Sequence, residues 1–332
     1  MVNKLEDRYS WEEIAERFCI QAQVPQKNQE DFKAWFLSKQ ALGVRFDAIT
    51  YHRAYNTQRS LKDDYDHFTV ICGSEGSGKS TFAANYCAVV SPTFCMKNVC
   101  FVKNDLLQAL ETAKRGDSLI LDEGALFLFS RESMSLDNRI VTKLFTLFRQ
   151  LNLHVCICMP NFWMIDSFIR DHRVKTLFRI PKRGDLTLYA EQAIRILSKE
   201  GAKYKGFDGI KLPYGTFTMG YYNAGMPNIN DFNDDNYRKF KAETLQAFIK
   251  EIKQGTENVS QDLFDVKYVS KKMGISEAAI RERLRDGQIK AKKVGSSWFV
   301  GKEELERLIK GEENMKGEGR VGKLIYLPTG RE

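Results

Sequence analysis

Residues 68–81 constrain the fold more than any other stretch of the chain. They read FTVICGSEGSGKST, an apolar run that stops at Gly73 and passes into a glycine-rich turn. The spacing from Gly73 to Ser80 matches G-x-x-x-x-G-K-[ST], a pattern in which a strand, a phosphate-binding loop and a helix follow one another. Glycines let such a loop curl where a Cβ would clash. The stretch therefore predicts a nucleotide-binding loop in an α/β domain.

The predicted roles within the loop follow from phosphate chemistry. Backbone N–H groups and the helix N-terminus are expected to surround the β-phosphate, Lys79 to reach the β and γ oxygens, and Ser80 to give a hydroxyl to Mg²⁺. The predicted nucleotide-binding residues are Gly73, Ser74, Glu75, Gly76, Ser77, Gly78, Lys79, Ser80 and Thr81. The expected cofactors are ATP and Mg²⁺. GTP is disfavoured because the chain has no N-K-x-D guanine-reading motif.

Apolar runs and amphipathic segments alternate after the loop, as they do in a parallel sheet with crossover helices. Strands are predicted at 68–72, 98–102, 118–121, 154–158 and 175–180, and helices at 79–89, 104–114, 137–151 and 162–170. The runs SLIL and HVCICM are nearly continuous in apolar residues, which is typical of strands covered on both faces. These elements predict an ATP-binding core over residues 61–182.

Two consecutive acids, Asp122 and Glu123, end the third predicted strand. Asp122 is expected to hold the water shell of Mg²⁺, and Glu123 to polarise a water molecule for attack on the γ-phosphate. Such a pair is commonly only a turn, but a phosphate loop about 40 residues upstream favours the catalytic interpretation. The pair therefore predicts hydrolysis by water.

Further catalytic candidates lie beyond the acids. Asn161, at the tip of the fourth predicted strand, is either a sensor of the γ-phosphate or an Asx cap of the next helix, and both roles can hold at once. An arginine finger could come from a neighbouring subunit, and among several arginines Arg149 and Arg173 are the favoured candidates. The alternative for each is a surface ion pair.

The order LILDEG, a helix over 138–149, LHVCICMPN and IDSFIRDHRV resembles the additional-strand P-loop ATPases. Within them it is most similar to the HerA/FtsK group and its zonula-occludens-toxin-like relatives, over about residues 66–182. The resemblance implies a RecA-like core, ATP, Mg²⁺ and a homo-oligomeric ring of the hexameric kind that moves DNA or serves phage assembly. Such motors commonly carry Gln at the fourth-strand tip, where this chain has Asn161.

The segments that flank the core give less specific predictions. Residues 1–60 are expected to be a helical N-terminal segment, with Ser10 as N-cap and Glu13 in its capping box, that lies on the core or on a neighbouring subunit. Residues 183–255 are expected to extend the core with a hairpin and a charged amphipathic helix. Their aromatic side chains fit either the hairpin core or stacking on single-stranded bases. Residues 256–261 are a predicted linker.

Residues 262–310 resemble a winged helix-turn-helix of the MerR/excisionase kind. The resemblance implies that the second helix enters the major groove of duplex DNA and that the wing faces phosphates. The implied DNA-binding residues are Ser276, Glu277, Arg281, Arg285, Lys290, Lys292 and Lys293. The alternative is a winged helix that contacts protein. Residues 311–332 are expected to be a flexible tail.

Composition sets the remaining expectations. The chain has a net charge of +8, which permits a nucleic-acid partner. No pair among its seven cysteines has the spacing of a zinc site with a matching second pair, so they are expected to be reduced core residues. No signal peptide or membrane-spanning run is predicted, so we expect a cytoplasmic protein. The preferred function is an oligomeric ATPase motor that translocates, packages or mobilises DNA. The alternatives are an ATP switch, such as a helicase loader or transposition helper, and a nucleotide-sensing DNA-binding regulator.

Overall fold

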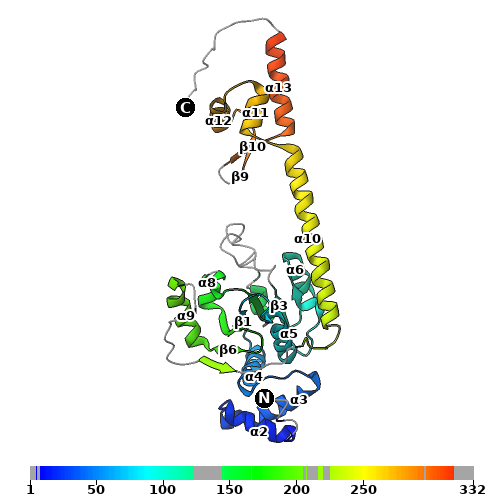
Figure 1. Cartoon of the computed structure of the whole chain (residues 1–332), viewed down its shortest axis with the longest axis vertical. Helices are drawn as coiled ribbons and strands as arrows, with labels where there is room; N and C mark the ends of the chain where they lie inside the picture. Colours follow the sequence, from blue (N-terminus) through cyan, green and yellow to red (C-terminus); the bar gives the residue numbers. More distant parts are fainter. Residues whose placement is uncertain are drawn as a thin grey trace. The chain divides into compact units, whose positions relative to one another are not determined.

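The computed structural model describes residues 5, 8–122, 144, 146–165, 167–204, 207, 216–219, 225–294 and 297–317 (Figure 1). The chain divides into two compact units, Met1–Thr244 and Leu245–Glu332. Each unit has a hydrophobic core of its own.

A seven-stranded sheet forms the centre of the first unit, in the order β2-β3-β4-β1-β5-β6-β7. Its strands are β1 (His67–Cys72), β2 (Val99–Cys100), β3 (Ser118–Leu121), β4 (His154–Met159), β5 (Val174–Arg179), β6 (Leu186–Tyr189) and β7 (Thr216–Met219). The first five strands in that order run parallel, and β6 and β7 extend the sheet at one edge, β6 antiparallel to β5 and β7 antiparallel to β6. The predicted parallel sheet is confirmed, and β4 lies between the strands that precede the glycine loop and the acid pair.

Helices cover both faces of this sheet (Figure 1). They are α5 (Lys79–Val90), α6 (Lys103–Thr112), α8 (Ser167–His172) and α9 (Glu191–Tyr204). Strand side chains alternate between the two layers: Ile71 and Phe178 pack with α5, whereas Val70 and Leu177 pack with α6, α8 and α9. Burial on both faces explains why the strand sequences are almost wholly apolar.

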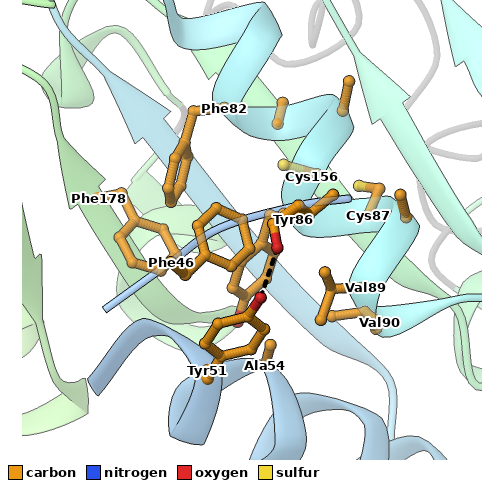
Figure 2. Close-up of a cluster of buried hydrophobic side chains, with 14 of the residues drawn as sticks. Phe46, Tyr51, Ala54, Phe82, Tyr86, Cys87, Val89, Val90, Cys156 and Phe178 are labelled. Carbon is orange, nitrogen blue, oxygen red and sulfur yellow. Dashed lines mark hydrogen bonds between the residues drawn. The ribbon is translucent and has the colours of Figure 1, made fainter. Parts of the chain in front are cut away.

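The N-terminal segment packs on the α5 face of the core. It contains α2 (Trp11–Gln21), α3 (Gln29–Ser38) and α4 (Ala48–Lys62), with short 3₁₀ turns η1 (Gln26–Asn28) and η2 (Gln40–Leu42). The predicted capping box is confirmed, because the Glu13 N–H donates to Ser10 Oγ and the Ser10 N–H to Glu13 Oε2. Figure 2 shows Phe46 and Tyr51 from this segment against Phe82 and Tyr86 of α5. The sequence left the position of this segment open, and the structure places it on the core.

Several elements differ from the sequence predictions. The helix predicted at 162–170 is divided into η6 (Phe162–Met164) and α8, because Ile165 has an extended backbone, and a further 3₁₀ turn, η3 (Met96–Asn98), precedes β2. The helix α9 was not predicted, and α4 lies almost wholly in the segment 1–60 that was expected to be helical, although no bounds were predicted for it. Within the helix predicted at 137–151, residues 144 and 146–151 are described; residues 144 and 146–150 are helical, and residue 151 lies in a turn.

A single helix, α10 (Asp234–Asp262), replaces the predicted boundary at 256–261. These residues continue the helix through Gly255, and their role as a linker stays a prediction. One glycine inside a helix costs only about 1 kcal/mol, which a long helix tolerates.

The second unit combines helices with a three-stranded antiparallel sheet of order β8-β10-β9. Its elements after α10 are β8 (Leu263–Asp265), α11 (Val266–Met273), α12 (Glu277–Arg285), β9 (Ala291–Val294), β10 (Ser297–Gly301) and α13 (Lys302–Gly317). Gly274, with φ +68°, ends α11, and the Ser276 hydroxyl caps α12. Residues 311–317, predicted to be flexible, continue α13, and residues 318–332 lie outside the described part.

Candidate functional site

The glycine loop links the carboxyl end of β1 to the first turn of α5. Gly76 and Gly78 have φ values of +72° and +93°, in the left-handed region that glycine adopts readily. Gly73 faces a different constraint, because a Cβ on it would lie 2.2 Å from the carbonyl oxygen of Ile180. The loop thus needs glycine at two positions for its dihedral angles and at a third for space.

The lysine of the loop is buried and folded back over the turn. Lys79 is 4% exposed, and its Nζ donates to the carbonyl oxygens of Gly73 at 3.0 Å and Ser74 at 2.9 Å. Its ammonium group therefore lies at the turn where the sequence predicts phosphates. An ammonium group has three N–H donors, so Lys79 can also donate to a phosphate oxygen at this turn.

Ser80 and Asp122 meet beside this turn. The Ser80 hydroxyl lies 3.2 Å from Asp122 Oδ1 and 3.1 Å from Asp122 Oδ2. Asp122 follows β3 directly, is fully buried, and donates its backbone N–H to the carbonyl of Cys100 at 2.9 Å. The structure thus brings together the two predicted magnesium ligands, although 42 residues separate them. Glu123, the predicted base, lies outside the described residues.

Two side chains of α10 complete the surroundings of Asp122, and the sequence analysis missed both. The Tyr237 hydroxyl donates to Asp122 Oδ2 at 2.5 Å, and Lys241 Nζ lies 3.7 Å from the same oxygen. Burial and the negative charge of Asp122 raise the pKa of Tyr237, so its hydroxyl stays protonated and remains a donor. Tyr237 and Lys241 are one helical turn apart, a spacing too common to identify a site.

The chemistry of this site suits Mg²⁺ held together with a phosphate ligand. Magnesium prefers oxygen donors and is usually bound by one or two carboxylates plus substrate phosphates. Ser80 and Asp122 supply a hydroxyl and a carboxylate, and the Lys241 ammonium shows that this carboxylate accepts a cation as neighbour. Among the described residues no cluster of three or more His, Cys, Asp or Glu side chains could hold a metal ion by itself.

Asn161 caps the turn after β4. Its side-chain oxygen accepts the backbone N–H of Trp163 at 2.9 Å, so the Asx-cap interpretation is observed. β4 runs parallel to β1 with Met159 opposite Cys72, which brings the tip of β4 beside the start of the loop. A role of Asn161 as γ-phosphate sensor stays a prediction.

Both candidate finger arginines lie at the amino ends of the strands, on the side of the sheet opposite to the glycine loop. Arg149 donates to the Asn152 side chain at 3.1 Å, next to the start of β4, and Arg173 donates to Asp66 Oδ2 at 2.6 Å, next to the start of β1. The length of β1, about 17 Å at ~3.3 Å per residue, separates those ends from the loop. The structure does not bring either arginine to the loop of its own chain, and a role of either one as an arginine finger stays a prediction.

The candidate DNA-binding residues belong to the second unit. Arg281 pairs with Glu277 at 3.1 Å on α12, and Arg285 donates to the Arg281 carbonyl at 3.3 Å. Both arginines line a groove of about 680 Å³ with Trp298 of β10. The backbone N–H of Lys290 donates to Glu304 at 3.0 Å, whereas the side chains of Lys292 and Lys293 lie outside the described part.

Comparison with known proteins adds little to this geometry. No protein-family model matches the chain, and no curated protein does. One similar solved structure is the N-terminal domain of zonular occludens toxin from Neisseria meningitidis, with 14% identity over 47% of this chain and 94% of that one and a TM-score of 0.31. The functional interpretation therefore rests on the site. No helix among the described residues has the length and apolar character to cross a membrane.

Proposed function

We propose that this chain is a Mg²⁺-dependent ATPase that acts on DNA. One observation carries the ATPase part: Ser80 Oγ lies within 3.2 Å of both oxygens of the buried Asp122, directly after a glycine loop that ends in Lys79. A hydroxyl and a carboxylate that converge at a helix N-terminus behind such a loop are the pair that holds Mg²⁺ on a bound triphosphate.

Each residue has one task in the proposed reaction. The loop amides and Lys79 bind the β- and γ-phosphates and neutralise their charge. Ser80 and Asp122 hold Mg²⁺, which when bound offsets the charge that develops on the phosphate oxygens. Glu123 accepts a proton from the attacking water, and Arg149 or Arg173 of a neighbouring subunit supplies positive charge at the γ-phosphate. ATP hydrolysis would therefore require several copies of the chain to assemble into an oligomer.

Two substitutions test the ATPase. Lys79→Ala should abolish binding of a fluorescent ATP analogue, because the phosphates lose their buried counter-charge. Glu123→Gln should bind the analogue like the wild type and lose turnover, measured as phosphate release. Turnover that survives in the glutamine variant would contradict the role of Glu123, and unchanged binding in the alanine variant would contradict the site itself.

We further propose that the second unit is a winged helix-turn-helix that binds duplex DNA. The turn at Gly274 between α11 and α12 and the β9–β10 ribbon support this assignment, and Arg281 and Arg285 are one turn apart on α12. The net charge of +8 favours a polyanionic partner. The competing role for this unit is protein contact.

Fluorescence anisotropy of a labelled duplex tests this assignment with the full chain. Replacing Arg281 and Arg285 together by Ala should weaken binding and reduce its salt dependence, because two phosphate or base contacts are lost. Arg307→Ala is the matched control, since Arg307 is also an exposed arginine paired with a glutamate in this unit. Equal affinity of the double variant and the control would favour protein contact.

The motor and its alternatives differ in what hydrolysis does. ATP-driven displacement of a third strand from duplex DNA would support a translocating ring, and its absence together with nucleotide-dependent DNA binding would support a switch. DNA-stimulated hydrolysis would exclude a regulator that only senses nucleotide. Light scattering with a non-hydrolysable ATP analogue tests the predicted homo-oligomer.

A further inference from the structure

The first two turns of α10 close over the acid of the proposed magnesium site. Tyr237 is 6% exposed and Lys241 has a side chain 34% exposed, and both reach Asp122 Oδ2. These residues belong to the same compact unit as the glycine loop. Asp122 is thus surrounded by Ser80 from α5 and by a hydroxyl and an ammonium from a segment more than 110 residues later in the chain.

The two α10 side chains differ in what they can do for a buried carboxylate. Tyr237 supplies a neutral O–H donor at 2.5 Å, within the range of short charge-assisted bonds. Lys241 supplies a full positive charge at 3.7 Å, which offsets part of the cost of burying the charged carboxylate. Tyr237 can keep its bond when a metal ion binds, but the ammonium of Lys241 and a divalent cation repel each other at one oxygen.

In the same position the ammonium also lies near an aromatic ring. Lys241 Nζ lies 5.6 Å from the centroid of the Phe101 ring, which also packs against Tyr237 with the centroids 5.6 Å apart. A cation above an aromatic face is stabilised at this range. Phe101 therefore helps to hold the ammonium beside Asp122, and the side chain, 34% exposed, can turn towards solvent when a metal ion takes its place.

We propose that Lys241 is an internal counter-ion of Asp122 that competes with Mg²⁺ for this carboxylate, and that Tyr237 is a positioning residue that holds the carboxylate in both states. The inference rests on the proposed function, because it takes Asp122 as a magnesium ligand. α10 then contacts the nucleotide site through one bond that metal binding preserves and one that it breaks. The chain continues from the core into this helix, so metal binding at Asp122 changes the contacts of the first two turns of α10.

Binding of Mn²⁺, a spectroscopic substitute for Mg²⁺, tests the proposal in the full chain with a non-hydrolysable ATP analogue present. Lys241→Met removes the charge and keeps the apolar stem, so Mn²⁺ affinity measured by electron paramagnetic resonance should rise by about tenfold as the competing cation is lost. Lys241→Arg should stay close to the wild type. Lys239→Met is the matched control, because Lys239 is an exposed lysine on the same helix, and it should change nothing.

Tyr237→Phe tests the positioning role separately. Mn²⁺ affinity should fall by about fivefold, whereas binding of the analogue in EDTA should stay unchanged, because only the metal ligand loses its donor. A fall in both affinities would show a merely structural role and overturn this assignment. Unchanged or weaker Mn²⁺ binding by Lys241→Met would overturn the counter-ion, provided that the wild type binds Mn²⁺ and the analogue. If the wild type binds neither, the proposed function fails instead.

Discussion

Replacing Phe46 by Ala should destabilise the first unit through its aromatic cluster. Phe46 is fully buried, and its ring centroid lies 5.5 Å from Tyr51, 5.5 Å from Phe82 and 6.4 Å from Tyr86 (Figure 2). A buried Phe→Ala change costs about 3–5 kcal/mol from lost transfer free energy and the remaining cavity. Three rings face Phe46 and are held by other partners, so they cannot move far enough to fill the cavity. The loss in the free energy of unfolding is therefore expected in the upper half of that range.

The assay is urea unfolding, followed by the fluorescence of the chain and by binding of an ATP analogue. Phe82 and Tyr86 belong to the helix that starts with Lys79, so loss of the cluster should lower the urea midpoint of both signals together. Ile20→Ala is the control: Ile20 is 76% exposed, and its truncation should change the free energy of unfolding by no more than about 0.5 kcal/mol. A cost below about 1 kcal/mol for Phe46→Ala would refute the packing of the N-terminal segment on the core.

Three further predictions concern the buried histidines, the close approach at Gly73 and the exposure of the thiols. Burial lowers the pKa of His154 to about 3 and the pKa of His67 well below its ordinary value of 6.5. The unfolded chain therefore binds protons at a higher pH than the folded chain, so below pH 6.5 each of these histidines should lower the free energy of unfolding by about 1 kcal/mol per pH unit. The urea midpoint should accordingly be lower at pH 5 than at pH 7. Gly73→Ala should weaken binding of the ATP analogue by more than about tenfold, because the new Cβ meets the Ile180 carbonyl, and unchanged affinity would contradict that close approach. In thiol titration of the native chain Cys95 should react first, since the other six cysteines are buried; a faster reaction elsewhere would show that the core opens there.

Local sequence rules determined much of this protein. The apolar run before Gly73, the glycine spacing and the Lys79–Ser80 pair predicted strand, loop and helix, and the structure has all three. The capping box at Ser10 was also predictable, because its two bonds join residues three apart. The position of Asp122 beside Ser80 followed from a rule of parallel sheets, since the carboxyl ends of all parallel strands lie on one side of the sheet, although β4 lies between β1 and β3.

The linker and the missed helices show where local rules fail. Residues 256–261 have the composition of a linker, yet their backbone continues α10, because a helix already extended over several turns adds residues at little cost. The bounds of α4 were not predicted from its sequence, and its buried face is defined by contacts with α2, α3 and α5. Such contacts join residues far apart in the chain and leave no local pattern.

Only the tertiary structure decided what surrounds the site. Tyr237 and Lys241 reach Asp122 from a helix whose sequence shows only an amphipathic pattern, and Arg149 and Arg173 lie at the amino ends of the strands because of where β4 and β5 begin. The sequence by itself determined the loop and its lysine, since their geometry depends on neighbours within a few residues. The partners of a buried charge depend on which distant segments pack around it, and that is set by the burial of the whole core.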